Sequence, residues 1–417
     1  MSNAVPAGWS DGTLTDFCDI NPRLAQRSEM NADTPVSFIK MEDVSNNAVV
    51  RNVRVAPYGQ VSKGFTSFQN GDVLVAKITP CFENGKGGFV QGLRNGVGFG
   101  STEFHVLRAR KDSNSEFLYQ FTNSEDFRLK GKANMTGSAG QRRVPTEYLK
   151  TLGVTFPPLL EQQKIAAILS SVDDVIEKTR VQIDKLKDLK TGMMQELLTK
   201  GIGSGGVPHT EFKDSPVGRI PEKWSVSTQG KVATFYNGRA YKLSEWEQEG
   251  TPVIRLQNLT GSGSDFYYST MQLPEKQYCE EGDLLYMWSA TFGPHIWHGP
   301  KAIYHYHIWK VVADEENITK TYLYYLLEFK TKQWKEQSTN GMGILHVTKG
   351  AMEGMELALP PLSEQHRIAQ ILDSVHSKLD VLIQKLRLVS DTKKALMQDL
   401  LTGKVRVNVD QKESAVA

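Results

Sequence analysis

Residues 128–150 hold six Lys or Arg side chains against a single Glu, a local charge of +5. Within this stretch lies the loop MTGSAGQRRV, whose glycines precede the triplet QRR at 141–143. Guanidinium, ammonium and amide donors of this kind bind phosphate and other anionic groups. The formal charge of the whole chain is only +2, so the sequence predicts a local anion-binding loop rather than a uniformly basic protein.

Four histidines gather in the stretch PHIWHGPKAIYHYHIWK, at positions 295, 298, 305 and 307. His305 and His307 would lie on one face of a strand, and neighbouring strand positions can ligate zinc. No nearby Cys or carboxylate completes a ligand set, and the first half of the chain has no counterpart of this stretch. We therefore expect a polar, aromatic sheet face here and no metal.

Motifs that would carry catalysis are missing from the sequence. Gly201, Gly203 and Gly206 satisfy G-x-G-x-x-G, but they follow a helical pattern and meet Pro208, whereas a dinucleotide-binding turn needs a strand before it and a helix after it. The sequence has no P-loop, no Asn-Pro-Pro-aromatic or Asp-Pro-Pro-aromatic tetrapeptide of an amino-methyltransferase, and no placeable Ser/His/Asp or Cys/His set. These absences favour a protein that does no chemistry of its own.

Two stretches far apart in the chain are versions of one sequence. Residues 157–200 and 360–403 align without a gap at a constant offset of 203, and 18 of the 44 positions are identical. A self-match of this length indicates an internal repeat. Proline pairs open both stretches and Gly201 and Gly403 close them, which predicts one helix between these limits in each stretch.

Both stretches place apolar residues at alternating steps of four and three, the spacing that supercoils a helix against a partner. Lys190 and Lys393 interrupt the two series at equivalent places, which suggests a register-fixing contact or a water-filled gap. Some forty residues make a helix of about 60 Å, and two such helices most simply bury their apolar sides against each other. The positions that we call the heptad seam are Ile165, Leu169, Val172, Ile176, Ile183 and Leu186 in the first stretch, and Ile368, Leu372, Val375, Leu379, Leu386 and Val389 in the second.

The blocks that precede these helices are strand-rich. Segments such as SFIKMEDV, GDVLVAKITP, EFHVLRA and LGVTFPP lie between Gly, Asn and Pro turns, and one helix is expected from about Glu116 to Lys130. The expected fold class is α+β, with two mixed α/β domains separated by two long antiparallel coiled-coil helices in a pseudo-two-fold repeat. The expected boundaries are 1–156 for the first domain, 157–203 for the first helix, 204–356 for the second domain, which begins with a turn-rich linker, 357–404 for the second helix, and 405–417 for a polar tail that frays.

The two strand-rich blocks share a framework but differ in side chains. TPVIRLQNL answers TPVSFIKMEDV and aligns Arg255 with Lys40. STNGMGILHV answers MTGSAGQRRV at the same offset of 203, so that QRR at 141–143 becomes ILH at 344–346. Two copies of one activity would keep equivalent functional residues, so this divergence favours two similar domains that recognise different targets.

Length and composition suit a soluble protein of two or three domains, with 39% hydrophobic and 23% charged residues among 417. No apolar run approaches the length that crosses a bilayer, and the first residues, MSNAVPAGWS, lack the apolar core of a signal peptide. The cysteines at 18, 81 and 279 have no disulfide or metal spacing. We therefore expect a cytoplasmic protein.

Taken together, this architecture resembles the specificity subunit of type I restriction-modification systems. The resemblance is carried by PPLLEQQKIA at 157–166, repeated as PPLSEQHRIA at 360–369. The loops GSAGQRRV and NGMGILHV also look like the glycine-bearing loop that precedes the helices of that family. The match covers nearly the whole chain, and the doubled motif is highly specific. The sequence departs from the family in the recognition domains, so no target sequence is carried over.

The resemblance implies a non-catalytic DNA-reading subunit. One recognition domain would read each half of a bipartite target, and the antiparallel helices would set the nonspecific spacing between the halves. Two modification subunits, which bind S-adenosylmethionine and methylate adenine, would clamp double-stranded DNA around it. Restriction subunits that use ATP and Mg for translocation and cleavage could join the assembly. No cofactor is expected on this chain itself.

Under this interpretation, DNA-contacting residues are expected among polar and cationic loop side chains, because these read base edges and hold phosphates. The candidates in the first domain are Lys77, Ser138, Gln141, Arg142 and Arg143, with Lys86 and Lys132 as phosphate contacts. The candidates in the second domain are Arg239, Tyr241, Trp288, Ser289, Asn340 and His346.

Two other interpretations remain open at this point. The chain could be a self-contained methyltransferase or nuclease with a doubled recognition domain, or a scaffold whose coiled coil joins two β-rich interaction modules. Methyl transfer by the purified chain alone would favour the first. Negligible DNA binding even beside a modification subunit would favour the second.

Overall fold

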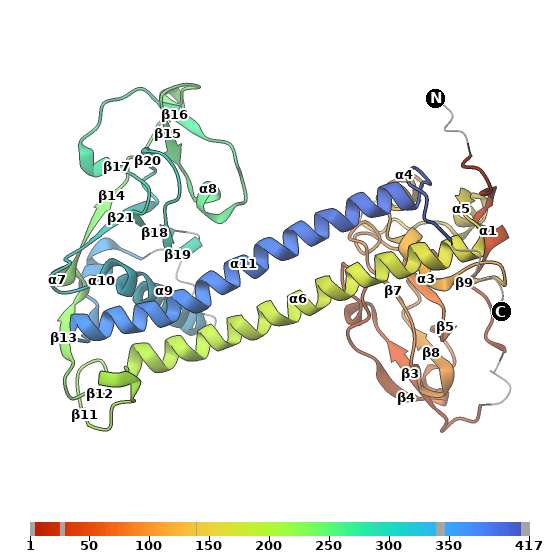
Figure 1. Ribbon diagram of the computed structural model, residues 1–417, viewed down its shortest axis with the longest axis horizontal. Helices are drawn as coiled ribbons and strands as arrows, with labels where there is room; N and C mark the ends of the chain where they lie inside the picture. Colours follow the sequence, from red (N-terminus) through yellow and green to blue (C-terminus); the bar gives the residue numbers. More distant parts are fainter. Residues whose placement is uncertain (1–4, 26–29, 139, 290, 339–346, 410–417) are drawn as a thin grey trace. The chain divides into compact units, whose positions relative to one another are not determined.

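The computed structural model describes residues 5–25, 30–138, 140–289, 291–338 and 347–409 (Figure 1). The chain divides into two compact units. The first unit consists of Met1–Val181 and Gln384–Ala417, and the second of Gln182–Ile383. Each unit therefore contains one globular domain together with a segment of each of the two long helices. In the described ranges, no helix combines the length and apolarity needed to cross a membrane.

The domain of the first unit is built on two four-stranded sheets. One has the strand order β2-β9-β6-β7 with antiparallel pairing throughout, and the other has the order β4-β3-β8-β5 with a parallel β3–β8 pair. The strands are β2 (Cys18–Ile20), β3 (Pro35–Ile39), β4 (Arg54–Pro57), β5 (Thr66–Gln69), β6 (Val73–Ala76), β7 (Gly87–Phe89), β8 (Val97–Gly100) and β9 (Phe104–Ala109), and a ribbon of β1 (Ser10–Thr13) and β10 (Gly153–Phe156) stands beside them. The helices are α1 (Leu14–Phe17), α2 (Tyr58–Val61), α3 (Ser115–Thr122), α4 (Glu125–Ala133) and α5 (Thr146–Thr151).

The single helix expected from Glu116 to Lys130 is in fact two helices, α3 and α4. Asn123 ends α3, and the Ser124 hydroxyl accepts the backbone N–H of Phe127 at 3.3 Å as the N-cap of α4. Asn and Ser side chains bond to nearby backbone groups more readily than they continue a helix, which explains the break. The bend lets the rings of Phe121 and Phe127 meet at a centroid distance of 5.4 Å.

The domain of the second unit repeats these strand orders. The sheet β14-β21-β18-β19 corresponds to β2-β9-β6-β7, and the sheet β16-β15-β20-β17, with a parallel β15–β20 pair, corresponds to β4-β3-β8-β5. The strands are β13 (Ser225–Thr228), β14 (Ala233–Asn237), β15 (Thr251–Ile254), β16 (Tyr267–Ser269), β17 (Tyr278–Cys279), β18 (Leu284–Ser289), β19 (Thr291–Ile296), β20 (Ala302–Tyr304), β21 (Ile308–Ala313) and β22 (Glu356–Leu359), of which β13 and β22 form the ribbon. The helices are α7 (Gln229–Val232), α8 (Leu256–Thr260), α9 (Lys320–Ser338) and α10 (Lys349–Glu353), and the linker carries a hairpin of β11 (Phe212–Lys213) and β12 (Ile220–Pro221).

The two repeated stretches form the long helices α6 (Leu159–Thr199, 41 residues) and α11 (Leu362–Leu400, 39 residues). Their bounds follow the proline pairs before them, and Gly201 and Gly403 adopt φ values of 68° and 71° after them. In the first unit, the start of α6 and the end of α11 share one core; in the second unit, the start of α11 and the end of α6 do so.

The side chains of the heptad seam are covered by other parts of the unit in which they lie. Residues of the seam are buried or half-buried, whereas apolar residues off the seam, such as Val181 and Leu388, are 43% and 69% exposed. The buried positions are Ile165, Leu169, Ile176, Ile183, Ile368, Leu372, Val375 and Leu379, and the half-buried positions are Val172, Leu186, Leu386 and Val389. Side chains at the heptad spacing thus supply the helix surface that each unit covers.

The two lysines in the seam are held by direct contacts. In the second unit, Lys190 Nζ donates to both carboxylate oxygens of Glu328 at 2.8 Å and to His376 Nδ1 at 3.2 Å. In the first unit, Lys393 Nζ lies 2.7 Å from Asp173 Oδ1. His376 occupies the position 203 residues after Asp173, so the two lysines pair with equivalent positions. A shift of either helix by one turn would leave a largely buried ammonium without its partner.

A buried glutamine joins each long helix to its domain. Gln162 in the first turn of α6 accepts the backbone N–H of Asn114, just before α3, at 2.8 Å, and donates to the carbonyl of Pro157 at 2.8 Å. Gln365 in α11 likewise accepts the N–H of Thr319, just before α9, at 2.9 Å, and donates to two backbone carbonyls at 2.9 Å. Both amides therefore connect the first turn of a long helix to the first turn of a domain helix.

The adjacent glutamates make a second connection. Glu161, 4% exposed, accepts Trp9 Nε1 at 3.2 Å and Arg406 Nε and Nη2 at 2.7 Å. The corresponding partners of Glu364 in the second unit are Trp224 Nε1 at 3.1 Å and His209 Nε2 at 2.8 Å. The expectation that the tail frays from 405 onward is therefore wrong for Arg406, because a buried carboxylate holds its guanidinium.

We expect Gln162→Leu and Gln365→Leu each to lower the free energy of unfolding by about 1–3 kcal/mol, because buried backbone donors and acceptors lose a side-chain partner. Denaturant titration followed by Trp fluorescence measures this change. Gln163→Leu is the matched control, since Gln163 is the exposed neighbour of Gln162. Equal stability of the Gln162 and Gln163 variants would show that the buried amide does not join helix and domain.

Candidate nucleic-acid interface

The basic loop of the first domain is a hairpin attached to the strand that ends at Ala76. Thr136 and Arg143 exchange two backbone hydrogen bonds of 2.9 and 2.8 Å, and the N–H of Thr79 donates to the carbonyl of Arg142 at 2.9 Å. Gly137 and Gly140 have φ values of 116° and 82°, which glycine adopts readily. The hairpin thus presents its tip, including the exposed side chains of Ser138 and Gln141, to solvent.

Within this hairpin, Arg143 is a structural anchor. Its Nε donates to Glu103 Oε2 at 3.0 Å, its Nη2 to Glu103 Oε1 at 2.9 Å, and its Nη1 to the carbonyl of Gln141 at 3.1 Å. The hydrogen bonds from Arg143 hold the pKa of Glu103 below its usual value, so the ion pair persists at neutral pH. These contacts use all three nitrogens of the guanidinium, so fewer of its donors remain for a ligand.

Arg142 is held less firmly than Arg143. Its guanidinium stands 4.0 Å from Glu83 Oε1, which already accepts the hydroxyl of Thr79 at 2.8 Å. The other oxygen of Glu83 is buried without a hydrogen-bond partner among the described residues. Of the two arginines, Arg142 is therefore the one whose donors remain available to a ligand.

The lysine candidates of the first domain differ in freedom. Lys77 is half-buried and follows β6. Its backbone N–H donates to the carbonyl of Glu103, and its carbonyl accepts the N–H of Val144. Lys86 is half-buried and donates its ammonium to the carbonyl of Met41 at 3.1 Å. Lys132 is exposed on α4. The structure thus brings Lys77 together with the hairpin, while Lys86 also supports the turn after β3.

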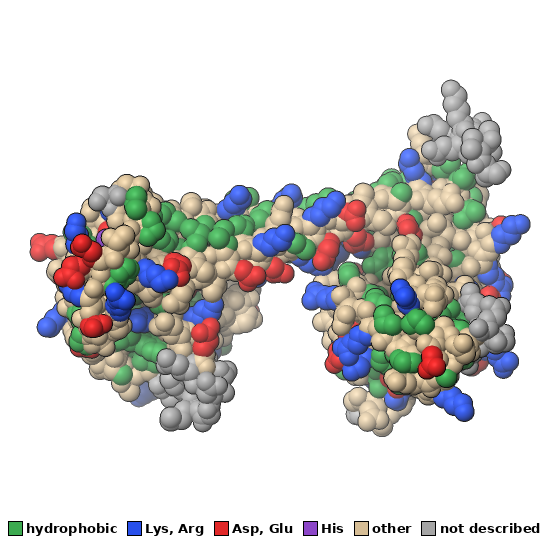
Figure 2. Space-filling view, turned by 90° about the horizontal axis from the view of Figure 1, so that it is seen from below, with side chains coloured by type: hydrophobic (Ala, Val, Ile, Leu, Met, Phe, Trp, Pro, Cys, Tyr) green, Lys and Arg blue, Asp and Glu red, His purple; other side chains and the backbone are tan. Residues whose placement is uncertain are grey.

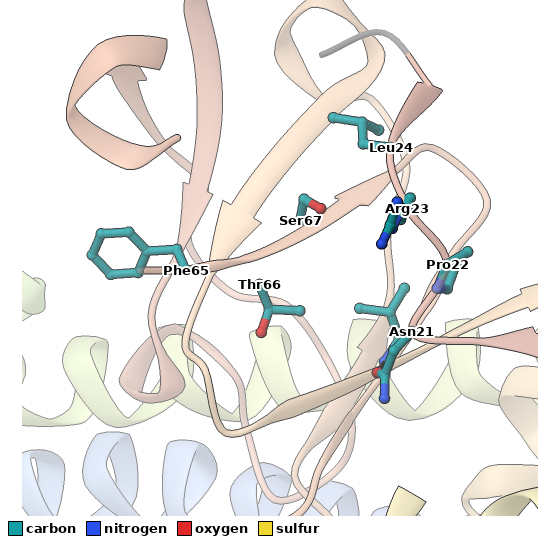
Figure 3. Close-up of a pocket in the computed structure, with 8 residues that line it drawn as sticks. Asn21, Pro22, Arg23, Leu24, Phe65, Thr66 and Ser67 are labelled. Atoms are coloured by element: carbon teal, nitrogen blue, oxygen red, sulfur yellow. Dashed lines mark hydrogen bonds between the residues drawn. The ribbon is translucent and has the colours of Figure 1, made fainter. Parts of the chain in front are cut away.

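A separate cleft of about 590 Å³ opens in the first domain (Figure 3). Figure 3 shows residues 21–24 on one side of it and residues 65–67 on the other, and none of the candidate DNA contacts lines it. Beside it, Asn21 Nδ2 lies 3.3 Å from His105 Nδ1, and His105 Nε2 lies 2.8 Å from the carbonyl of Val144. Burial lowers the pKa of His105 to about 4, so this histidine is neutral at pH 7 and supports the base of the hairpin.

In the second domain, stacked aromatic rings occupy the region of the candidates. Trp246 stacks on Tyr241 at 4.9 Å and contacts Tyr267 at 4.5 Å and His305 at 6.1 Å between ring centroids. We call these four residues the aromatic cluster. Arg239 lies with its guanidinium 4.5 Å from the Tyr241 ring and donates to Glu245 Oε1 at 2.6 Å. Arg239 and Tyr241 are thus together, although a carboxylate already binds Arg239.

Trp288 takes the place that Lys77 has in the first domain. Its N–H donates to the carbonyl of His307 at 3.2 Å, as that of Lys77 does to Glu103. Its indole Nε1 donates to the carbonyl of Tyr306 at 2.8 Å, and its ring stands 5.4 Å from that of His307. Ser289, another of the candidates, is only 3% exposed at the end of β18. Asn340 and His346 lie outside the described residues.

The histidine-rich stretch forms part of this aromatic surface. Within the described ranges, no three His, Cys, Asp or Glu side chains are placed to hold a metal. Burial, with the nearby His307 and Arg255, lowers the pKa of His305 to about 4, so its ring is neutral at pH 7. The ring therefore contributes aromatic area rather than charge.

The candidate list omitted two cations at corresponding positions, Lys40 after β3 and Arg255 after β15. The Asp43 carboxylate and the Asn258 amide accept their backbone N–H groups at 2.8 Å, so both residues begin the same kind of turn. The Lys40 ammonium lies 3.5 Å from Glu42. The alignment of TPVSFIK with TPVIR was the signal that could have identified this pair.

Charge at these surfaces is local. Figure 2 shows Lys and Arg side chains interspersed with Asp and Glu over the face that it presents of each unit. The first-domain candidates combine cations with paired carboxylates, whereas the second-domain candidates combine arginine with aromatic rings. Equivalent positions of one framework therefore carry side chains of different chemistry.

Comparison with known proteins decides the family. The profile of the type I restriction modification DNA specificity domain matches residues 6–188 and again 221–388. The chain belongs to this family. The two matches cover both globular domains and most of both long helices, so the family's domain occurs twice in this chain.

Named relatives agree with this assignment. The chain is 37% identical over 191 residues to the EcoAI type I restriction enzyme specificity subunit of Escherichia coli, an alignment that covers 44% of this chain and 32% of that subunit. It is 26% identical over 414 residues to the putative MjaX specificity subunit of Methanocaldococcus jannaschii, covering 97% and 95% of the two chains. The crystal structure of a type I S subunit from M. genitalium covers 98% of both chains with a TM-score of 0.59 at 15% identity, which shows a shared fold.

We expect Glu103→Gln to expose the hairpin to trypsin, which cleaves after Arg142 and Arg143. Loss of a well-formed surface ion pair is worth about 1 kcal/mol, and this shifts the local opening equilibrium about fivefold. The measurement is the rate of cleavage at these two bonds under native conditions. Glu147→Gln, which removes an exposed pair with Lys150, is the control and should leave the rate unchanged. An unchanged rate in the Glu103 variant would contradict the anchor.

Proposed function

We propose that this chain is the DNA-specificity subunit of a type I restriction-modification complex and reads a bipartite target with one domain per half-site. The observation that carries the proposal is the family domain present twice on one strand framework with unlike side chains at equivalent positions. Trp288 occupies the position equivalent to Lys77, and Arg255 the position equivalent to Lys40. The shared framework places a recognition surface in each domain, and the unlike residues suit unlike base sequences.

In the first domain, the hairpin tip and Arg142 would contact base edges or phosphates, while Lys77, Lys86 and Lys132 add positive charge near the backbone of the DNA. In the second domain, Arg239, Tyr241 and Trp288 would contribute through rings and guanidinium donors. Because Arg143 and Arg239 are bound to carboxylates, we assign them mainly to positioning the loops that carry them.

The two long helices would form the spacer between half-sites. We infer that α6 and α11 run antiparallel as one coiled coil, with a pseudo-two-fold axis relating the two domains. The Lys190–His376 and Lys393–Asp173 contacts support this, since both join residues whose numbers add to the same total, as one continuous antiparallel register requires. About 1.5 Å of helix per residue would then fix the separation of the recognition surfaces.

Other polypeptides would perform the chemistry. Two modification subunits with S-adenosylmethionine would methylate adenine, and restriction subunits with ATP and Mg would translocate and cleave DNA when present. This chain would supply neither a cofactor site nor a catalytic group, and its place would be the cytoplasm.

The direct test incubates the purified chain, alone and with its modification subunit, with DNA and labelled S-adenosylmethionine. The proposal expects methyl transfer only when both proteins are present, at a single bipartite sequence found by methylation sequencing. Transfer by this chain alone would favour a self-contained methyltransferase. Binding without any sequence preference in the joint assembly would favour a scaffold.

We expect Arg142→Ala to weaken binding to the target by about 1–3 kcal/mol and to relax preference at one base pair if the guanidinium reads a base. Competition binding with the assembled complex and singly substituted duplexes measures both effects. Arg110→Ala is the matched control, because Arg110 is similarly exposed but lies at the opposite end of β9 from Glu103. An even loss for every sequence would instead assign Arg142 to phosphate, and no loss would remove it from the interface.

We expect deletion of one heptad from each long helix to shorten the tolerated gap between half-sites by about three base pairs, since seven residues span about 10 Å and base pairs stack every 3.4 Å or so. Residues 178–184 and 382–388 face each other in the proposed register, and their removal leaves both lysine contacts in place. Methylation sequencing measures the gap. Deletion in α6 alone is the control and should abolish specific methylation, because the seam would no longer match. An unaltered gap would contradict the spacer.

A further inference from the structure

Arg255 differs from the other arginines near the candidate surfaces. Arg143 and Arg239 each donate to a carboxylate at 3.2 Å or less, and Arg142 stands 4.0 Å from one. Among the described residues, no carboxylate lies within 4.0 Å of the Arg255 guanidinium, and no hydrogen bond of that group is formed. Its charge-assisted donors are therefore unused within the described part of the chain.

Aromatic faces hold Arg255 instead. Its guanidinium carbon lies 5.8 Å from the centroid of the Trp246 ring and 5.1 Å from that of Tyr267, and Tyr241 stacks on Trp246. Cation–π attraction acts on the flat face of a guanidinium. The N–H groups point outward in the plane and stay free for a planar acceptor.

The backbone beneath this side chain is rigid. Arg255 follows Ile254, a fully buried residue of β15, and the carbonyl of Ile254 accepts the N–H of His305 at 2.9 Å. The N–H of Arg255 itself donates to Asn258 Oδ1 at 2.8 Å. Because the backbone is fixed and the guanidinium is already held against the rings, ordering this side chain on binding a ligand costs less conformational entropy.

We infer that Arg255 is a specificity-determining residue of the second domain and makes a bidentate contact with O6 and N7 of a guanine in its half-site. Trp246 and Tyr267 are positioning residues that orient it. This inference rests on the proposed function, because it assumes that the second domain faces DNA. Among the described residues, no aromatic ring lies over the ammonium of the corresponding Lys40, which stands 3.5 Å from Glu42, so the two domains hold this cation differently.

The test uses the full chain assembled with its modification subunit and the target that methylation sequencing defines. We expect Arg255→Ala to lower affinity for the target about 5-fold to 150-fold and to abolish preference at one G·C pair of one half-site. Arg255→Lys should keep binding to unrelated DNA but lose the same preference. Tyr267→Leu, which removes a ring and leaves the arginine, should relax that position while binding to unrelated DNA is unchanged.

A base substitution isolates the contact. Replacing the guanine by 7-deazaguanine removes the N7 acceptor, so it should weaken binding of the natural chain and have no further effect on Arg255→Ala. Arg219→Ala is the matched control, because Arg219 also lies over a ring, that of Phe212 at 5.6 Å, but in the linker hairpin. It should match the natural chain in every assay.

The results that would contradict the Arg255 inference differ from those that would contradict the proposed function. If Arg255→Lys keeps both affinity and sequence preference, the residue contacts phosphate only and the inference fails. Full affinity and preference in Arg255→Ala would also overturn it, while the proposed function would stand. A natural complex that binds DNA with no sequence preference would overturn the proposed function, and this inference with it.

Discussion

A charged group inside an apolar helix seam is the constraint on which the arrangement depends. Lys190 and Lys393 sit where the heptad pattern calls for an apolar residue, and each is satisfied by a partner on another helix. Removing one partner of a largely buried pair costs several times more than the pair contributes, because the remaining charge stays desolvated. Apolar residues alone would tolerate sliding by a heptad; these lysines do not. Within its own unit, each contact pairs one residue of α6 with one residue of α11, and a shift of either helix would break that contact.

A defined register matters only if the domains cannot rock on their helices. Gln162 and Gln365 oppose such movement, because each joins the first turn of a long helix to the segment that starts a domain helix, with buried backbone groups as partners. Glu161 and Glu364 add an indole partner on each side. The motif PPLxEQ thus has a physical explanation. Its prolines precede the helix, and its Glu and Gln are buried and hydrogen-bonded to the domain rather than exposed. The motif therefore connects each long helix to the domain of its unit.

Local periodicity explains what could be predicted from the sequence. The helix limits and the buried positions of both long helices follow from spacing within forty residues. The repeat follows from the match of two such stretches at an offset of 203. Contacts between distant residues could not be read in this way. Arg143 is one of the candidate DNA contacts, and Glu103, forty positions earlier, binds its guanidinium. Ser289 looked like a loop residue and is enclosed at the end of β18. Arg406 looked like part of a loose tail and reaches the buried Glu161. Each miss concerns a partner that no local pattern reveals.

The division between framework and variable side chains explains how one fold can serve two targets. Asp72 and Asp283 occupy equivalent turns, where each carboxylate accepts a backbone N–H at 2.8 Å, and both also bind a cation of the neighbouring strand. Such residues hold the strands in place and are alike in both domains. Arg255 begins a different turn and enters it through its backbone N–H, which donates to Asn258, so its side chain can change without loss of that hydrogen bond. Side chains that bind a target can therefore differ between the two domains. The buried Glu and Gln of the motif and the heptad seam, which hold helix and domain together, stay alike in both units.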